Sequence, residues 1–330
     1  MIIVQYLIDA ASVGGLYALT ALGIGLIFGV IGLVNFAYGE YIMMGAYVIL
    51  LAVGFNWPVV ILFMLVYVTA MALLSDFLVF RPVRSADPST LMIVSFGLSY
   101  MTQYIYVMLF GSLTRTVNFL PMVNQAIEIG GVRIAGVNLL QIGATLILTV
   151  ALASFIKFTK LGYQMRAVSE NPRMARMVGV DIHRVVAAAF ITSAVLAVTV
   201  SALFITQTGS MTPFFGTSLT LIGFVATVIG GLGSLVGCAL GGFLVGFATT
   251  LLQLMLPPDL QPFRDAFVFA AVILVLLVRA GGLIVLSSKQ ERVWCRDRKR
   301  KAFCAWACAR RGPGSAWPCP SSWRLCLSAR

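Results

Sequence analysis

The residues best suited to chemistry in this chain are three carboxylates that fall among apolar segments: Asp9, Glu40 and Asp76. An ionised side chain in the middle of a bilayer costs about 2.5–3.5 kcal/mol, so each needs an explanation if these segments cross a membrane. Asp9 and Asp76 fall near the ends of their segments, where we expect interfacial carboxylates in contact with water. Glu40 differs, because it ends a polar insertion, Asn35-Phe36-Ala37-Tyr38-Gly39-Glu40, between two apolar runs.

Two interpretations of Glu40 stay open. It could line a water-filled path, in which case Asn35, Tyr38, Gly39 and Glu40 together form a translocation path or gate. It could instead mark a turn between two helices on the cytoplasmic side of a membrane. The orientation inferred below favours the turn, and the four residues are kept as the candidates for a path.

Other chemistry-bearing patterns are missing from the sequence. The single histidine, His183, falls at the end of a basic loop, where we expect a solvated side chain. No HExxH, GxSxG or CxxC pattern occurs, so we expect no enzyme activity, no metal and no cofactor. There is also no Gly-Lys dipeptide, which excludes a GxxxxGK[ST] nucleotide-binding loop. If ATP drives this protein, a separate polypeptide must hydrolyse it.

The composition is that of a membrane protein. Of the 330 residues, 60% are hydrophobic and 10% are charged, and the mean hydropathy is +0.99. Soluble domains carry about 25% charged residues. We therefore predict an all-α, polytopic integral membrane protein. The N-terminal MIIVQYLIDA lacks a basic region, so the first apolar segment is predicted to be a retained span and not a cleaved signal peptide.

The net charge of +12 is concentrated at one end of the chain. Residues 289–330 carry 11 basic and 2 acidic side chains, a net +9, which leaves +3 for the first 288 residues. The high charge therefore does not indicate a nucleic-acid partner. Five of the six cysteines also fall in this tail, and Cys238, which lies among glycines, is expected to be a small packing residue.

Apolar runs long enough to cross a bilayer set the expected architecture, because a spanning helix needs about 20 residues. We predict nine spans, or eight if one segment is re-entrant, near 7–33, 37–55, 57–80, 91–110, 138–157, 185–208, 217–233, 236–256 and 264–280. Segment 157–184 carries six basic side chains and two acidic ones. Basic loops stay in the cytoplasm, so nine spans place the N-terminus outside and the C-terminus inside.

Within this basic loop the sequence predicts a short helix. Asn171 suits the N-cap, Pro172 suits the first helical position, and Gly179 suits the end. Such a helix could be a passive connector or a knob that docks on a cytoplasmic partner. The loop by itself favours neither interpretation.

Glycines recur at four-residue spacing at 25/29, 233/237/241 and 242/246. This spacing lets a neighbouring helix backbone approach closely, and packing inside one subunit is favoured over a subunit interface. Val30-Ile31-Gly32 with Gly39, and Val228-Ile229-Gly230 with Gly237, share a seven-residue glycine spacing at an offset of 198. This hints at an internal repeat of the transporter kind.

The chain resembles the LivH-type permeases of branched-chain amino-acid ABC importers. The resemblance covers roughly residues 5–285 and is most specific at Asn35-Phe36-Ala37-Tyr38-Gly39-Glu40. It extends to Gly15-Leu16-Tyr17-Ala18-Leu19, to Glu170-Asn171-Pro172 and to Gly230-Gly231-Leu232-Gly233-Ser234. The resemblance implies an all-α permease domain over 1–288 with a cytoplasmic coupling loop at 158–184. It also implies that residues of this loop couple the permease to an ATPase, namely Glu170, Asn171, Pro172, Arg173, Ala175 and Gly179.

The partners implied by the resemblance are a second, homologous permease, two cytoplasmic ATP-binding-cassette subunits and a periplasmic substrate-binding protein, in the lipid of a bacterial inner membrane. Two departures stand out: Ala280 where such permeases often have proline, and the tail 289–330, which we expect to be irregular and foreign to the family. An ion-coupled carrier acting without an ATPase is the alternative function. Importers of urea or short-chain amides are the alternative within the family.

Overall fold

The computed structural model of the chain describes residues 2–270, apart from 33, 53, 85, 118, 121–125, 130, 131, 232 and 265. The predicted tail 289–330, and all but the start of the predicted span 264–280, lie outside the described residues.

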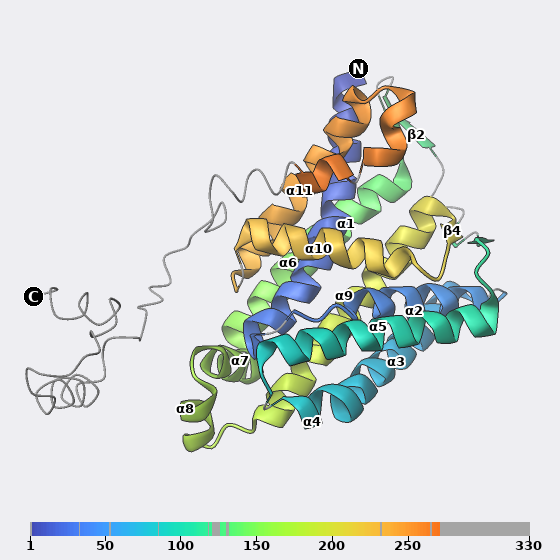
Figure 1. The fold of residues 1–330 in the computed structure, drawn as a ribbon. Coiled ribbons are helices and arrows are strands. Elements are labelled where there is room, and N and C mark those ends of the chain that lie inside the picture. Colours follow the sequence, from blue (N-terminus) through green and yellow to red (C-terminus); the bar gives the residue numbers. More distant parts are fainter. Residues whose placement is uncertain are drawn as a thin grey trace, which may run out of the picture. The chain divides into compact units, whose positions relative to one another are not determined.

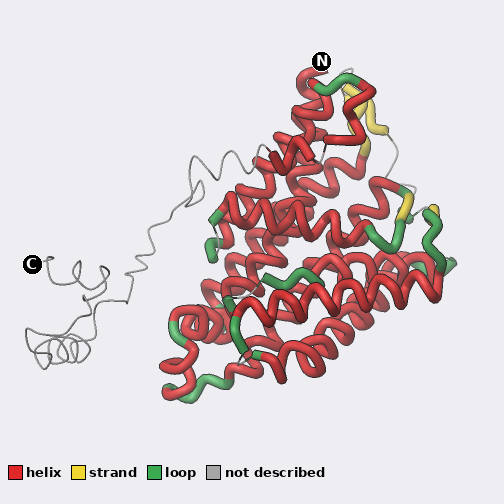
Figure 2. Tube along the Cα trace, in the orientation of Figure 1, coloured by secondary structure: helices red, strands yellow, loops and turns green. Residues whose placement is uncertain are grey.

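The described chain is almost entirely helical, as predicted (Figure 1; Figure 2). Six stretches are long and apolar enough to cross a membrane. They contain α1 (Ile2–Ile31), α3 (Trp57–Ser75), α5 (Pro88–Phe110), α6 (Gly136–Phe158), α9 (Ile182–Thr208) and α11 (Leu235–Met255). The α3 stretch continues through a π-helical turn, Asp76–Phe80, into α4 (Arg81–Val83). A 3-10 turn, Pro258–Phe263, follows α11.

Two apolar helices are shorter than the spans predicted for them. The helix α2 (Tyr38–Leu51) has 14 residues and α10 (Phe215–Gly230) has 16. At about 1.5 Å per residue they are roughly 21 and 24 Å long, less than the ~30 Å hydrocarbon core of a bilayer. Neither helix alone reaches across that core. The span predicted at 37–55 is five residues longer than α2, whereas the span predicted at 217–233 agrees with α10 to within three residues at each end.

The two short helices contact each other at a pair of glycines, one from each helix. A Cβ added to Gly39 would collide with the carbonyl oxygen of Gly216, and a Cβ added to Gly216 would collide with the carbonyl of Gly39. The starts of α2 and α10 therefore touch backbone to backbone, which only two glycines allow.

The helix α1 forms the centre of the core. It contacts α6, α9, α10 and α11, and residues along its length, such as Leu19, Leu22 and Ile24, are at most 1% exposed. One glycine face of α11 packs on α1, since a Cβ at Gly242 would meet the Ala18 backbone, and the other packs on α10, since a Cβ at Gly241 would meet the Ala226 carbonyl oxygen. The sulfur of Cys238 fills the space beside Gly25. Packing inside the subunit is thus confirmed for most of the predicted glycines and for Cys238, but it is wrong for Gly29 and Gly233, where an added Cβ would meet nothing within 4 Å.

The arrangement repeats with a fixed offset of 177 residues. After α1 comes Gly32 (φ +76°) and after α9 comes Gly209 (φ +62°) (209 − 32 = 177). After α2 comes Gly54 (φ +106°) and after α10 comes Gly231 (φ +98°), again 177 apart. All four glycines adopt positive φ values, which glycine accepts without steric cost. The starts of α2 and α10 also follow this offset, and α11 starts within one residue of where the offset places the start of α3.

The two repeats run in opposite directions. In Figure 1, α1 runs from the N-terminus toward the end of the molecule where α7 (Lys160–Glu170) and α8 (Pro172–Met177) lie, while α9 starts at that end and runs away from it. Inverted repeats of this kind are typical of transporters. The offset of 198 expected from the glycine spacing is wrong, because it equates the end of α1 with the end of α10.

The two ends of the molecule differ in content. The basic α4, α7 and α8 lie together at one end, and the N-terminus lies at the other (Figure 1). The described strands, yellow in Figure 2, lie away from α7 and α8. They form two antiparallel pairs: β1 (Arg115–Thr116) with β4 (Ser210–Met211), and β2 (Ala126–Ile129) with β3 (Val132–Ala135).

Candidate translocation and coupling sites

The polar insertion forms a break between α1 and α2. Asn35 is 2% exposed, and its Oδ1 accepts a hydrogen bond from the Ala37 N–H at 3.0 Å. The Phe36 N–H donates to the Ser95 hydroxyl at 3.4 Å, and the Phe36 ring stacks on Phe96 with centroids 4.0 Å apart. Side chains thus satisfy backbone groups that a helix would otherwise satisfy. Non-helical backbone is tolerated within a membrane where protein buries it in this way.

Tyr38 and Gly39 fix the start of α2 in the core. Tyr38 is fully buried, and its hydroxyl lies against Gly23 of α1, where any Cβ would collide with it. That hydroxyl has no hydrogen-bond partner among the described residues. Gly39 makes the backbone contact with α10 given above. Both residues are thus buried at the start of α2, and their role in a path stays a prediction.

Glu40 is not a solvated residue of a cytoplasmic turn. The turn exists at Phe36–Ala37, but Glu40 follows it inside α2 and is only 1% exposed. Its Oε1 accepts hydrogen bonds from the Ser99 hydroxyl and from Gln103 Nε2, each at 2.7 Å. Gln103 Nε2 also bonds the Thr217 hydroxyl of α10. Three helices, α2, α5 and α10, therefore meet at this carboxylate.

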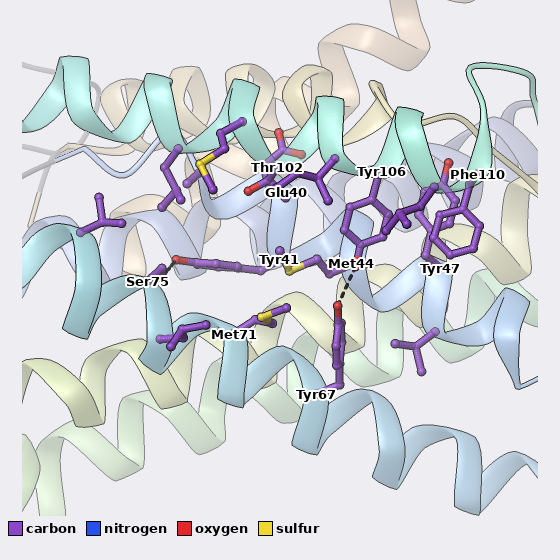
Figure 3. Close-up of a pocket in the computed structure, with 18 of the residues that line it drawn as sticks. Glu40, Tyr41, Met44, Tyr47, Tyr67, Met71, Ser75, Thr102, Tyr106 and Phe110 are labelled. Atoms are coloured by element: carbon purple, nitrogen blue, oxygen red, sulfur yellow. Dashed lines mark hydrogen bonds between the residues drawn. The ribbon is translucent and has the colours of Figure 1, made fainter.

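A cavity of about 510 Å³ lies beside Glu40, between α2, α3 and α5 (Figure 3). Its wall consists mainly of aromatic, methionine and aliphatic side chains. Across it, the Tyr67 hydroxyl of α3 and the Tyr106 hydroxyl of α5 form a hydrogen bond at 2.9 Å, drawn dashed in Figure 3. Tyr41 and Ser75 form another between α2 and α3. The volume suits a small molecule, since ligand pockets commonly measure about 300–1,000 Å³.

The basic loop contains two helices where one was predicted. The helix α7 starts at Thr159, whose hydroxyl accepts a hydrogen bond from the Gly162 N–H at 3.1 Å. Met165 and Val168 of α7 are 2% exposed, whereas Tyr163 is 57% exposed. The helix is thus amphipathic and lies with one face on the protein. Glu170 is the last residue of α7 and directly precedes Asn171, the predicted cap of the short helix.

The predicted short helix is confirmed as α8. The Asn171 side chain accepts a hydrogen bond from the Met174 N–H at 3.2 Å, which is an N-cap. At the other end, the Gly179 N–H bonds the Arg176 carbonyl and the Val180 N–H bonds the Ala175 carbonyl. With Gly179 at φ +89°, these two bonds form a Schellman motif.

The outer surface of α8 is apolar as well as basic. Met174, Met177 and Val178 are 58%, 82% and 83% exposed, whereas Ala175 is 5% exposed and holds α8 against the protein. An exposed apolar patch rimmed by charge is typical of a protein interaction site. Arg173 lies in this helix.

A buried ion pair connects this end of the molecule to α3. Asp76, in the π-helical turn, is 7% exposed, and its Oδ1 lies 2.6 Å from Arg84 Nη2. The other guanidinium nitrogen of Arg84 lies 3.3 Å from Nδ1 of His183, at the start of α9. The expectation of an interfacial Asp76 in water is therefore wrong, because Arg84 supplies its counter-charge inside the protein. His183 is exposed, as expected.

Asp9 is also held by a partner. Its Oδ1 accepts a hydrogen bond from Asn138 Nδ2 of α6 at 2.6 Å, and Ser12 donates to Asn138 and Gln141 beside it. Among the described residues, no three His, Cys, Asp or Glu side chains gather as a metal ion would require.

The family model of the "Branched-chain amino acid transport system / permease component" matches residues 6–277. The chain belongs to this permease family. The match covers the break, the cavity and the loop with α7 and α8, so all the sites described above fall inside it. The family is a family of transport proteins and not of enzymes.

Relatives of the permease cover nearly the same length. The chain is 29% identical over 302 residues to the high-affinity branched-chain amino acid transport system permease protein LivH of Escherichia coli K12, covering 85% of this chain and 94% of the relative. It is 29% identical over 297 residues to BraD of Pseudomonas aeruginosa, covering 85% and 95%. LivH of Salmonella typhimurium is 28% identical over 296 residues, covering 85% and 94%. No solved structure matches the chain.

Three features of the permease's sites were missed from the sequence. Ser99 and Gln103, which hold Glu40, are four residues apart on one face of α5, a polar pair in an otherwise apolar run that could have been noticed. The start of α7 was signalled by Thr159 followed by Met165 and Val168 at helical spacing. The contact of Arg84 with His183 had no sequence signal, because the two residues are 99 positions apart.

Proposed function

We propose that this permease is the membrane-spanning subunit of an ATP-driven importer of branched-chain amino acids in a bacterial inner membrane. Its partners are a second, homologous permease, two cytoplasmic ATPase subunits and a periplasmic binding protein. The observation that carries the proposal is the family match over residues 6–277, in a chain whose apolar composition and helices suit a membrane subunit. The full-length relatives named for branched-chain amino acid transport give the substrate class.

The proposed orientation places α4, α7 and α8 in the cytoplasm and the N-terminus outside. The positive-inside rule supports it, because basic residues of two separate loops lie at one end of the molecule (Figure 1). Arg81 and Arg84 come from one loop, and Lys160, Arg166 and Arg176 come from the other. Cysteines introduced one at a time at exposed sites, Met177 and Leu113, test the orientation: a thiol reagent confined outside should label only position 113.

In this proposal α8 is the contact through which an ATPase drives the permease. Its support is a rigid shape, fixed by the Asn171 cap and the Schellman motif at Gly179, together with the exposed Met177 and Val178. A helix clamped at both ends transmits a push as a unit, and α8 connects through only four residues to α9 in the core. Glu170, Pro172 and Arg173 complete this coupling segment.

The translocation path is proposed to pass the start of α2, at Asn35, Tyr38, Gly39 and Glu40. The support is a broken helix buried in protein and a short helix that cannot span the bilayer, both of which mark substrate sites in transporters. The carboxylate of Glu40 lies at the edge of the cavity.

Reconstituted transport tests the proposal. The permease is co-purified with the second, homologous permease and the two ATPase subunits. The complex is placed in vesicles with leucine-loaded binding protein outside and ATP inside. We expect leucine uptake that requires ATP and the binding protein. Vesicles with the permease alone and a sodium or proton gradient serve as the control. Uptake driven by the gradient without ATPase subunits would overturn the importer.

A further inference from the structure

Glu40 carries one satisfied and one unsatisfied oxygen. Oε1 accepts hydrogen bonds from Ser99 and Gln103, while Oε2 is buried and has no partner among the described residues. The side chain also lines the cavity between α2, α3 and α5, which no lysine, arginine or histidine lines. The site therefore holds a carboxyl group without a counter-charge in apolar surroundings, and its ionised form is costly there unless a cation completes the site or a proton neutralises it.

We propose that Glu40 receives the ammonium group of an aliphatic amino acid in transit, while the cavity wall contacts the substrate's side chain. The inference rests on the proposed function and assigns the recognising residue within it. Oε2 is itself covered and Oε1 is held by Ser99 and Gln103, so the substrate reaches the carboxylate when these two donors release Oε1 and the Glu40 side chain turns toward the cavity. Two neutral donors are then exchanged for a charged one. Hydrogen bonds between two charged groups are the stronger kind, which favours this exchange.

The chemistry of the wall selects this class of cation. A metal ion takes several oxygen ligands, and the cavity offers a single carboxylate with hydroxyls. An alkylammonium ion needs fewer ligands, and aromatic faces such as those of Tyr41 and Tyr106 stabilise it further (Figure 3). The Thr102 hydroxyl, which lies beside Glu40 in Figure 3, offers a neutral donor to the carboxylate of an amino acid.

The remaining wall suits a branched aliphatic side chain. Met44, Val48 and Leu98 come from α2 and α5 and present flexible or branched apolar groups to the cavity. The mouth between α3 and α5 is also apolar, since Leu78, Met101 and Leu109 are 59%, 61% and 70% exposed. The ligand that fits this cavity has a primary ammonium group attached to an apolar group. Two kinds of molecule meet this description: an aliphatic amino acid and the lipid phosphatidylethanolamine, through its headgroup. We assign the amino acid.

Replacing Glu40 by glutamine tests the assignment, because the glutamine Oε1 can still accept from Ser99 and Gln103 while the charge is lost. In the complete importer, in vesicles of phosphatidylcholine and phosphatidylglycerol, we expect Glu40→Gln to reduce ATP-driven leucine uptake by about ten- to a hundredfold. The matched control Asp9→Asn removes a carboxylate outside the cavity and should keep uptake near the wild-type rate. Co-purification of the ATPases verifies assembly of both variants.

A binding measurement identifies the group that Glu40 recognises. Leucine binding to the assembled complex without binding protein should be displaced by isopentylamine, which keeps the ammonium group, and not by 4-methylpentanoate, which lacks it. In the Glu40→Gln complex, isopentylamine should no longer displace leucine. Undiminished uptake by Glu40→Gln, or equal competition by the two analogues, would overturn the inference.

The lipid source is tested by adding phosphatidylethanolamine to the vesicles. Mass spectrometry that finds this lipid retained by the wild type but not by Glu40→Gln, together with leucine binding that does not respond to the substitution, would overturn the amino-acid assignment. If the wild-type complex takes up no branched-chain amino acid at all, the proposed function fails. Isopentylamine competition for a labelled amine then still decides whether Glu40 is an ammonium site.

Discussion

Replacing Gly39 by alanine tests whether α2 and α10 must touch through bare backbone. The added Cβ would collide with the Gly216 carbonyl oxygen and the Thr220 hydroxyl. The hydroxyl can rotate, but the carbonyl belongs to the α10 backbone and cannot, so the two helices must separate. Thr220 already donates to that same carbonyl at 2.9 Å, which restricts its rotation as well.

The expected magnitude follows from two opposing effects. Alanine improves helix propensity over glycine by about 1 kcal/mol. Overpacking of a tight contact costs about 1–3 kcal/mol, and we expect the upper part of that range here because the obstacle is backbone. The net destabilisation should be about 1–2 kcal/mol. The matched control is Gly29→Ala in α1, where the added Cβ meets nothing within 4 Å and only the propensity gain of about 1 kcal/mol applies.

Thermal stability of the purified permease, followed by size-exclusion chromatography after heating, measures both variants in one detergent. We expect Gly39→Ala to lose its monodisperse peak at a lower temperature than wild type, and Gly29→Ala to retain its peak to the same or a higher temperature. A Gly39→Ala protein as stable as Gly29→Ala would refute the close crossing of α2 and α10.

Three further substitutions probe the end of the molecule that carries α4, α7 and α8. Ala175→Pro removes the 3.0 Å hydrogen bond to the Asn171 carbonyl and costs about 3 kcal/mol within α8; ATP hydrolysis should continue while leucine uptake stops, and normal uptake would make α8 a mere connector. Gly179→Ala forces alanine into φ +89°, at a cost of about 1–2 kcal/mol, and should lower uptake less than the proline does. Arg84→Gln leaves Asp76 unpaired and should destabilise the permease by about 3–5 kcal/mol in thermal or denaturant unfolding. Adding Asp76→Asn to Arg84→Gln should recover part of that loss, and a purely additive double mutant would exclude the ion pair.

The sequence predicted the transmembrane helices well because a single physical property decides them. A run of about 20 apolar residues without charge has few alternatives to a spanning helix. The helices α3, α5, α6, α9 and α11 accordingly begin and end within a few residues of the predicted spans. Capping residues, which act locally, also placed both ends of α8 correctly.

The starts of the two short helices could not be predicted in the same way. The apolar composition around α2 and α10 predicts that these segments are buried, but not that the two helices start against each other. Their starts depend on the Gly39–Gly216 contact, which joins residues 177 positions apart. The same limitation made Glu40 look like a turn residue. Its burial depends on Ser99 and Gln103, whose distance from it cannot be derived from one sequence.

Asp76 illustrates a third limit. Its position near the end of an apolar run indicated that the carboxylate contacts water. A helix of ordinary pitch would have kept the carboxylate close to the membrane interface. The π-helical turn at Asp76–Phe80 widens the helix locally, and the carboxylate then meets Arg84, eight residues later. Such turns occur mostly at functional sites, and no residue pattern here announced one.

The inverted repeat connects the Glu40 site, the helix α8 and the contact of Arg84 with His183. Glu40 and Thr217 are equivalent positions, 177 residues apart, and Gln103 bonds both. At the end that carries α7 and α8, α8 leads directly into α9 of the second repeat, while the contact of His183 with Arg84 reaches the first repeat. In the proposed importer, a push on α8 would enter both repeats at this end, and the Gly39–Gly216 crossing with its Gln103 bridge would join them at the centre. Movement of one repeat against the other would therefore load the Gln103–Thr217 hydrogen bond, which joins the two repeats beside Glu40. Gln103 also donates to Glu40, so the carboxylate that we assign to substrate recognition would lose a donor when that bridge moves.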